Sequence, residues 1–546
     1  MRFKLMAAVF SCLVSSGLAA ATDIVVSDQA GMDGLDARLH ALIARGEQDI
    51  RVRFSPGTYF FRDQHLSLMG VDRPGLSISL SGIGVRLVGE GEDYVPTRTI
   101  RGLTAPFGGP FEVTDGYVDL EEGRNLDLRS AVGQVRKRPE VVDRSSGLCR
   151  VLTGDASMSA RDAGESWILL TQWYRSVCYK VEKVEGGYVY FRSPRLTDNG
   201  NALTDIDADY KYAKVLPRYF LYNQKSSKTP YVRDGRIHFP DRMTLHRCRA
   251  SRFLTVSGSH LKELSVSGIE FFGNGGKDCL LKFYRSSLGT LSVSDCVFEG
   301  IRGDAVVIQF TRGVRLSGNV FRHCYRGCIE IGYESDAASV TGNRFEDIGL
   351  MSDNNPCVWN VASRTRIADN TFVDFTYCAV WSGIHFSESM SDKCSSVIEN
   401  NEMYQTPAFR KAPSRTMLDS GAIYLATVSQ GQVIRNNYIH DIGGPADNRG
   451  IFLDDGAVNV EVYGNLVVGI ANSYCIDSRR VRWVETHADT KITRVNVNNY
   501  IGENTVDGRV RFETRGGNDG CRKGTNTFLK SGIDREKVLA DWRKAR

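Results

Sequence analysis

The sequence lacks long apolar runs, a strong charge of either sign and most of the motifs that mark familiar chemistries. Its one leader-like apolar stretch, residues 5–14, is too short to cross a bilayer, so we expect no membrane span. A formal net charge of +5 over 546 residues excludes the basic field that nucleic-acid binding needs. No P-loop, nucleophile elbow or dinucleotide fingerprint stands in a suitable context.

Metal-binding patterns are also missing. No cysteine pair has CxxC spacing and no histidine cluster has the spacing of zinc ligands, so we expect no metal and no other cofactor. In an oxidising compartment Cys324 could pair with Cys328, or Cys378 with Cys394. Other cysteines, however, open repeated strands at small inward positions, and a buried thiol packs as a small apolar residue. We therefore favour stacked free thiols.

The amino terminus predicts export. Arg2 and Lys4 precede the apolar stretch, and small residues follow at 17–21, which is the pattern of a secretory signal peptide over residues 1–21. We expect a periplasmic or extracellular protein.

One short phrase recurs between residues 264 and 501: a β-prone run, then Asp or Asn, then a large apolar residue. The gaps of 24 to 36 residues are typical of a solenoid, whose coils bury their apolar faces only by stacking. Stacked Asn side chains can bond along the column, and Asn tolerates a left-handed turn. The sequence thus predicts an all-β protein, a right-handed parallel β-helix. The Asp and Asn positions are Asp295, Asn319, Asn343, Asn370, Asn401, Asn437, Asn465 and Asn499.

A second column follows from the short strand after each turn. Strand side chains alternate between faces, so if the second residue of each strand points inward, the third points outward. We expect the resulting band of exposed rings between carboxylates to grip sugar rings by stacking, which predicts a carbohydrate substrate. The outward column reads Val307, Glu330, Trp359, Trp381, Tyr424, Phe452 and Asp477.

Four aspartates are candidate catalytic acids. Asp454 lies two places after Phe452 and Asp477 lies on the next coil, which gives a separation of ~8 Å from strand geometry, within the ~6.5–9.5 Å range of inverting glycosidases. Asp455 adjoins Asp454, and like charges so close raise one pKa, although Asp-Asp-Gly also simply makes a turn. Asp419 is the fourth.

Other polar residues near these acids are candidate substrate contacts. His385 follows Trp381 on a long loop, and Glu330 is a candidate distal sugar contact. Arg479 and Arg480 flank Asp477 and could bind a substrate carboxylate, or form an ordinary salt bridge.

The predicted organisation has five parts. Residues 22–97 form a cap and first coils, with an amphipathic helix around Leu35, Leu39, Leu42 and Ile43. Residues 98–243 lose the repeat and predict an inserted antiparallel β-rich domain. Residues 244–505 form the main solenoid and 506–546 a C-terminal strand and helix cap, after the signal peptide at 1–21.

Several phrases resemble a known group. LDSGAIYL, IRNNYIHDIGG and GIFLDDGAVNVEVYGNL are similar to phrases of secreted β-helix carbohydrate enzymes close to glycoside hydrolase family 141, although Ala422 stands where a second Gly is usual. The resemblance implies glycan hydrolysis, with fucosidase and xylanase activities in the family. By motif, its acidic residues fall on Asp419 and on Asp454 or Asp455.

Three functions remain open at this point. The first is a glycoside hydrolase that uses paired carboxylates. The second is a polysaccharide lyase acting on a uronate-containing glycan, which Arg479 and Arg480 favour. The third is a non-catalytic glycan-binding protein, because solenoids host many functions. The oligomeric state is also left open.

Overall fold

The computed structural model describes most of the chain from residue 21 onward. The described residues are 21–61, 64–89, 111–113, 117–119, 133–134, 140–143, 145–152, 167–172, 175–192, 211–215, 220–223, 231–233, 236–238, 243–246, 252–274, 279–301, 303–324, 327–332, 335–349, 356–383, 395–410, 420–425, 429–443, 448–454, 456–471, 473–479, 483–487, 490–494, 496–513 and 520–545.

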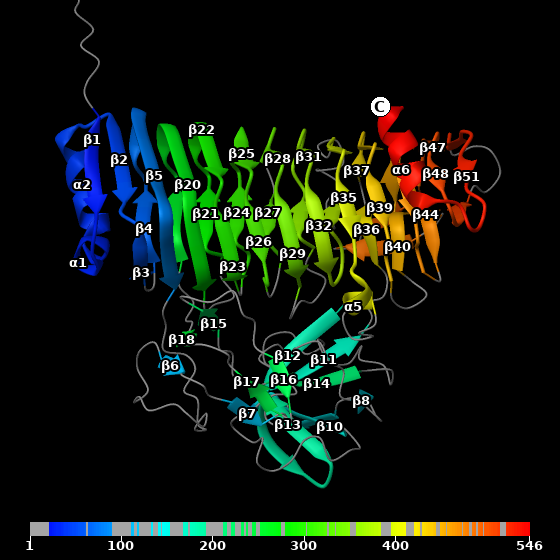
Figure 1. Ribbon diagram of the computed structural model, residues 1–546, viewed down its shortest axis with the longest axis horizontal. Coiled ribbons are helices and arrows are strands. Elements are labelled where there is room, and N and C mark those ends of the chain that lie inside the picture. The colour runs from blue at the N-terminus through cyan, green and yellow to red at the C-terminus, as the bar shows by residue number, and fades with distance from the viewer. Residues whose placement is uncertain are drawn as a thin grey trace, which may run out of the picture.

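The chain folds as a parallel β-helix with three stacks of strands along its length (Figure 1), as predicted. One stack is an 11-stranded sheet, and the other two belong to a 23-stranded sheet whose stacks share β5 and β20. The 11-stranded sheet contains, in spatial order, β4 (Gln64–Met69), β19 (Arg252–Ser257), β21 (Leu281–Tyr284), β24 (Val306–Gln309), β27 (Ile329–Ile331), β30 (Val358–Asn360), β33 (Val380–Ser382), β36 (Ser420–Leu425), β40 (Asn448–Leu453), β44 (Tyr474–Ser478) and β49 (Arg509–Phe512).

The 23-stranded sheet covers the other two sides. Its first stack contains β1 (Thr22–Val26), β2 (Asp49–Phe54), β5 (Asp72–Gly89), β20 (His260–Asn274), β22 (Ser287–Ser294), β25 (Val314–Ser317), β28 (Ser339–Thr341), β31 (Arg366–Ala368), β34 (Val397–Glu399), β38 (Val433–Arg435), β42 (Glu461–Tyr463), β47 (Tyr500–Gly502) and β50 (Arg522–Lys523). Its second stack adds β3 (Gly57–Phe61), β23 (Val297–Ile301), β26 (Val320–Arg322), β29 (Arg344–Ile348), β32 (Thr371–Phe375), β35 (Glu402–Tyr404), β39 (Tyr438–His440), β43 (Leu466–Val468), β48 (Thr505–Val506) and β51 (Thr527–Phe528).

The large apolar residue of each repeat fills the interior. These side chains lie in register from coil to coil and are fully buried, because only stacking removes them from water. Neighbouring rings are 4.5–5.2 Å apart between centroids, with planes 6–11° from parallel. The stacked rings are Phe271, Phe298, Phe321, Phe345 and Phe372.

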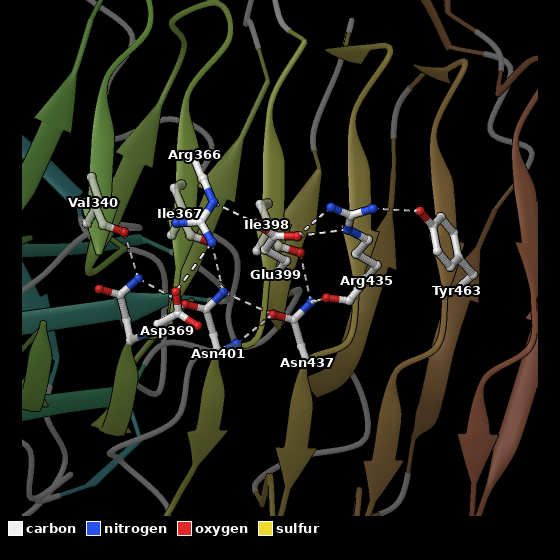
Figure 2. Close-up of polar contacts among 11 residues, drawn as sticks. Val340, Arg366, Ile367, Asp369, Ile398, Glu399, Asn401, Arg435, Asn437 and Tyr463 are labelled. Atoms are coloured by element: carbon white, nitrogen blue, oxygen red, sulfur yellow. Dashed lines mark hydrogen bonds and ion pairs between the residues drawn. The ribbon is translucent and has the colours of Figure 1, made fainter. Parts of the chain in front are cut away.

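The predicted Asn column is present and forms a continuous amide ladder (Figure 2). Asn401 Nδ2 donates to Asn437 Oδ1 at 2.9 Å and to the Ile367 carbonyl oxygen at 2.9 Å, and the backbone N–H of Asn401 donates to the same Asn437 oxygen. The same bonds recur at each step, so the buried amides satisfy one another and the coil corners. The ladder runs through Asn319, Asn343, Asn370, Asn401, Asn437, Asn465 and Asn504 to Asn526.

At each end of the column, the predicted residue is not the one that joins the ladder. Cys296 takes the first place, donating its N–H to Asn319 Oδ1, while Asp295 occupies the left-handed turn just before it with φ 54°. Asn499 is not in the ladder: its Oδ1 accepts the backbone N–H of Val460 and its Nδ2 donates to the Ala457 carbonyl. The left-handed residue therefore precedes the ladder residue, and glycine takes that place in several coils.

Free thiols are confirmed in the core. Cys328, Cys357 and Cys475 are free and buried, and so is Cys324, so a Cys324–Cys328 disulfide is wrong. Burial raises the pKa of the Cys328 and Cys357 thiols well above the usual value and that of Cys475 to about 12. These thiols act as small apolar side chains. The other suggested partner, Cys394, lies outside the described residues.

Helices α1 (Gln29–Asp33) and α2 (Leu35–Arg45) cover the first coil, at the blue end of Figure 1. Leu35, Leu39 and Ile43 are buried, as the helical spacing predicts, and Gly46 ends α2 with φ 91°. Asp36 Oδ1 accepts the backbone N–H of Ser67 in β4, so the helix satisfies a group at the open sheet edge.

The insertion contains antiparallel strands, as predicted, drawn to one side of the solenoid in Figure 1. Its main sheet contains β8 (Gly133–Gln134), β14 (Lys211–Val215), β11 (Trp167–Gln172), β12 (Arg175–Glu185), β13 (Tyr188–Arg192), β10 (Leu148–Leu152) and β9 (Glu140–Asp143). Two smaller sheets contain β15 (Phe220–Asn223), β18 (Met243–His246) and β6 (Phe111–Val113), and β16 (Tyr231–Arg233), β17 (Arg236–His238) and β7 (Tyr117–Asp119).

The last helix, α6 (Arg535–Lys544), lies along the flank of the solenoid. Arg535 pairs with Asp441 and Asp507, and Trp542 Nε1 donates to the Gly464 carbonyl at 3.1 Å. None of the helices in the described ranges has the length and apolar character that crossing a membrane requires. The remaining elements are α5 (Pro407–Arg410), β37 (Ser429–Gln430), β41 (Ala457–Val458), β45 (Trp483–His487) and β46 (Thr490–Arg494).

Candidate functional site

The outward column predicted from the short strands is present in the 11-stranded sheet. Its members pair in register from each coil to the next, while their strand neighbours, such as Ile423 and Leu425 beside Tyr424, belong to the core. The column therefore faces away from the core. In order it contains Val307, Glu330, Trp359, Trp381, Tyr424, Phe452 and Asp477, and Arg511 follows.

The predicted exposure of the rings is wrong for most of this column. Trp381 and Tyr424 are each 5% exposed and Phe452 is fully buried, whereas Trp359 is 37% exposed. The physical reason is a second layer: the three buried rings form their own apolar cluster with Val361, Tyr377 and Cys378. Outward-facing here does not mean solvent-facing, except at Trp359.

Trp359 has defined neighbours on both adjacent coils. The Trp381 ring meets it edge to face, with centroids 5.6 Å apart and planes at 89°. On the preceding coil Glu330 is its register neighbour, and Gln309 Nε2 donates to Glu330 Oε1 at 2.7 Å. An exposed indole thus lies beside a carboxylate that a neighbouring amide orients.

Asp454 lies on the column side, directly after β40. Its backbone N–H donates to the Leu425 carbonyl at 2.8 Å, which continues the sheet, and the Tyr424 hydroxyl donates to Asp454 Oδ2 at 3.0 Å. Asp454 as a whole residue is 5% exposed. The Tyr424 ring stacks on Phe452, with centroids 4.9 Å apart and planes 8° from parallel, which fixes the hydroxyl that binds Asp454.

Asp477 is on the predicted face but is completely buried among arginines, so its predicted outward exposure is wrong. Arg449 Nε donates to Oδ2 at 2.8 Å, and Arg511 binds both oxygens at 2.6 Å. The hydrogen bond to Asp477 raises the pKa of Arg511. Arg479 Nε is 3.5 Å from Oδ2, and its side chain is 28% exposed.

The arginines also pack on the column. The Arg449 guanidinium lies 3.9 Å from the centroid of the Phe452 ring, and that of Arg479 lies 5.1 Å from it. Cation–π contacts and a buried carboxylate together hold these charges in place.

Four predicted site residues lie outside the described residues: Asp419, Asp455, His385 and Arg480. Among the residues that are described, no three His, Cys, Asp or Glu side chains come together so as to hold a metal ion.

Sequence reasoning missed Arg449, Arg511, Tyr377 and Gln309. One signal could have found Arg511: the strand after Asp477 carries Arg at the position in register with it, and opposite charges on adjacent coils pair. The alternation of side chains along a strand does not identify Arg449 as a site residue, because it precedes Gly450, where a turn is equally expected.

Comparisons with known proteins agree with the fold. A family model described as "Right handed beta helix region" matches residues 283–481. The chain is a right-handed parallel β-helix. No curated protein matches its sequence.

Solved structures with similar chains share little sequence. One titled "Glycoside hydrolase" is 9% identical with TM-score 0.36, covering 96% of this chain and 98% of that one. XylC with xylose is 9% identical with TM-score 0.39, covering 84% and 70%. The mannuronan C-5 epimerase AlgE6 A-module of Azotobacter vinelandii is 9% identical with TM-score 0.33, covering 94% and 95%.

Proposed function

We propose that the protein is an exported glycoside hydrolase, of the kind represented by family 141, that cleaves a poly- or oligosaccharide beside Asp454. One observation carries this proposal. An in-register column of rings on one flank of the solenoid leads to Asp454. The carboxyl group of Asp454 accepts a hydrogen bond from the hydroxyl of Tyr424, which belongs to that column. Sugar sites combine aromatic side chains with a few fixed polar groups, and here Trp359 supplies the exposed ring while the buried rings hold Asp454 in place.

In this proposal Asp454 is one member of the acid/base pair. One carboxyl group protonates the leaving oxygen and the other activates water. Asp455 and Asp419, the residues that the family resemblance also names, are the candidate partners. Asp477 has both oxygens bound by arginines, so we assign it a positioning role: it holds Arg449 and Arg511 against the column.

The substrate contacts divide by exposure. Trp359 and Glu330 would touch sugar directly, and His385 and Arg480 remain proposed contacts. Trp381, Tyr424 and Phe452 would support the site from beneath, because they are buried. The proposal that the protein is exported rests only on the signal-like sequence of residues 1–21.

The first test is the release of reducing ends from a panel of neutral and acidic polysaccharides. Asp454→Asn keeps an acceptor for Tyr424 but cannot transfer a proton, so we expect turnover to fall about 100-fold or more. Asp369→Asn is the matched control, because Asp369 occupies an exposed left-handed turn on another flank (Figure 2), where Asn also fits. Full turnover by Asp454→Asn would end the assignment.

A second candidate, a polysaccharide lyase acting on a uronate-containing glycan, has its own supporting observation. Arg449, Arg479 and Arg511 gather around the single carboxylate of Asp477, and Arg479 is partly exposed. A lyase needs such cations to neutralise the uronate carboxylate.

The two candidates differ in product. A lyase leaves an unsaturated sugar that absorbs in the near ultraviolet, whereas a hydrolase releases reducing ends without that absorbance. Arg479→Gln would lower activity on uronate substrates about tenfold under the lyase proposal. Under the hydrolase proposal with a neutral glycan, the same variant would change turnover little.

A further inference from the structure

The end of the column far from Asp454 is the only part where a described ring of the column is substantially exposed. Trp359 is 37% exposed, and the edge-to-face contact with Trp381 holds its ring at a set angle. Because its supporting ring is itself buried, Trp359 does not need a ligand to be ordered.

A polar group is fixed beside this ring. Glu330 lies one coil away in register, and the 2.7 Å hydrogen bond from Gln309 restricts its carboxylate. A flat apolar surface next to an oriented acceptor suits one kind of ligand well: a sugar ring, whose C–H face stacks while its hydroxyls donate to the carboxylate.

The spacing along the solenoid adds the size of that ligand. Three coil steps, through Trp381 and Tyr424, separate Trp359 from Phe452, and Asp454 follows Phe452 on the same coil. At ~4.8 Å per step this is about 14 Å along the axis. One step is close to the length of one sugar ring, so about three units fit between Trp359 and the acid.

We infer that the substrate is a linear glycan of at least about four units that runs along the solenoid axis, with a distal unit bound by Trp359 and Glu330. The inference rests on the proposed cleavage at Asp454 for its second anchor. The distal site itself does not depend on Asp454: it consists of Trp359, the Trp381 ring that supports it, Glu330 and Gln309.

Binding is tested on an array of linear oligosaccharides, neutral and acidic, from disaccharides to octasaccharides. We expect wild-type protein to retain octasaccharides and to lose affinity below about a tetrasaccharide. Trp359→Ala should weaken octasaccharide binding roughly tenfold, and Trp359→Tyr should restore most of it, because a smaller ring still stacks. Trp542→Phe on α6 is the matched control, which we expect to bind as wild type.

Kinetics separate this inference from the proposed function. For any array glycan that is cleaved, kcat/KM should rise with chain length in wild type and become flat in Trp359→Ala. Hydrolysis without chain-length dependence would overturn the inference and leave the proposed function intact. Length-dependent binding that Trp359→Ala abolishes, without any cleavage, would support the distal site and reject the proposed function. Equal binding by wild type and Trp359→Ala, or no binding to any member, would overturn the inference.

Discussion

Two columns of aromatic side chains run along the solenoid, one inside it and one on its outer flank. The inner column consists only of phenylalanines, from Phe271 to Phe372, with nearly parallel, fully buried rings. The outer column mixes Trp359, Trp381, Tyr424 and Phe452, and it continues into the charged residues Glu330 at one end and Asp477 at the other.

The difference shows what marks a site in a solenoid. Each coil adds one residue to every column, so in-register rings arise on either side of a strand from stacking alone. The outer column is distinguished by its polar groups: the Tyr424 hydroxyl on Asp454, and the Arg449 guanidinium on Phe452. Rings predict packing; rings with fixed polar partners predict chemistry.

The largest effect should come from breaking the inner column. Phe321→Ala removes a fully buried ring between two stacked neighbours, so we expect the free energy of unfolding to fall by about 3–5 kcal/mol. Trp359→Ala at the exposed end of the outer column should change it by less than ~1 kcal/mol. Guanidinium titration of both variants measures the difference. Equal losses would mean that the two columns do not differ in structural role.

The amide ladder beside the inner column should be next in sensitivity. Asn401→Ala leaves the buried N–H and amide of Asn370 without the oxygen they share, which we expect to lower the free energy of unfolding by about 2 kcal/mol. The control is Asn400→Gly, because Asn400 is an exposed left-handed residue at a place that glycine takes in other coils. If Asn401→Ala were as stable as this control, the ladder would contribute little.

Much of this contrast follows from the sequence. The repeat predicts the solenoid, the Asn ladder and the register of both columns. Residues one repeat apart stack on adjacent coils, whatever the side chains around them. The burial of Trp381, Tyr424 and Phe452 does not follow, because it depends on how side chains outside the short strands, such as Tyr377, pack against these rings. A period of two assigns a face to a residue, and only tertiary packing decides what lies over that face.

The ends of the ladder show the same limit. Cys296 and Asp295 are adjacent, and spacing alone cannot decide which one occupies the left-handed turn. At the other end, the excursion of β45 and β46 delays the next ladder residue to Asn504, whereas the repeat spacing points to the nearer Asn499. Local pattern fails where coil length changes.

A smaller change sharpens the outer column. Tyr424→Phe keeps the ring that stacks on Phe452 but removes the hydrogen bond to the buried Asp454. We expect a loss of about 1 kcal/mol in the free energy of unfolding and a fall of about tenfold in turnover. Denaturant titration and steady-state kinetics measure the two effects separately. Lower stability with unchanged turnover would make this contact purely structural.

The smallest effect belongs to an ionic column on a third flank, where Arg366, Glu399 and Arg435 pair across coils (Figure 2). Burial by itself raises the pKa of Glu399, but hydrogen bonds from Arg435 and Arg366 outweigh burial and hold the pKa below its usual value. A carboxyl group with a lowered pKa stabilises the fold above its unfolded pKa, about 4.3, and loses that contribution as pH falls through the folded pKa.

Glu399→Gln should therefore be less stable than wild type by under about 1 kcal/mol at pH 7, because both arginines are partly exposed, and the difference should vanish in acid. Thermal unfolding of both proteins from neutral to acid pH measures this, with the exposed Glu461→Gln as control. A difference that stays constant with pH would show that Glu399 acts through packing and not through its charge.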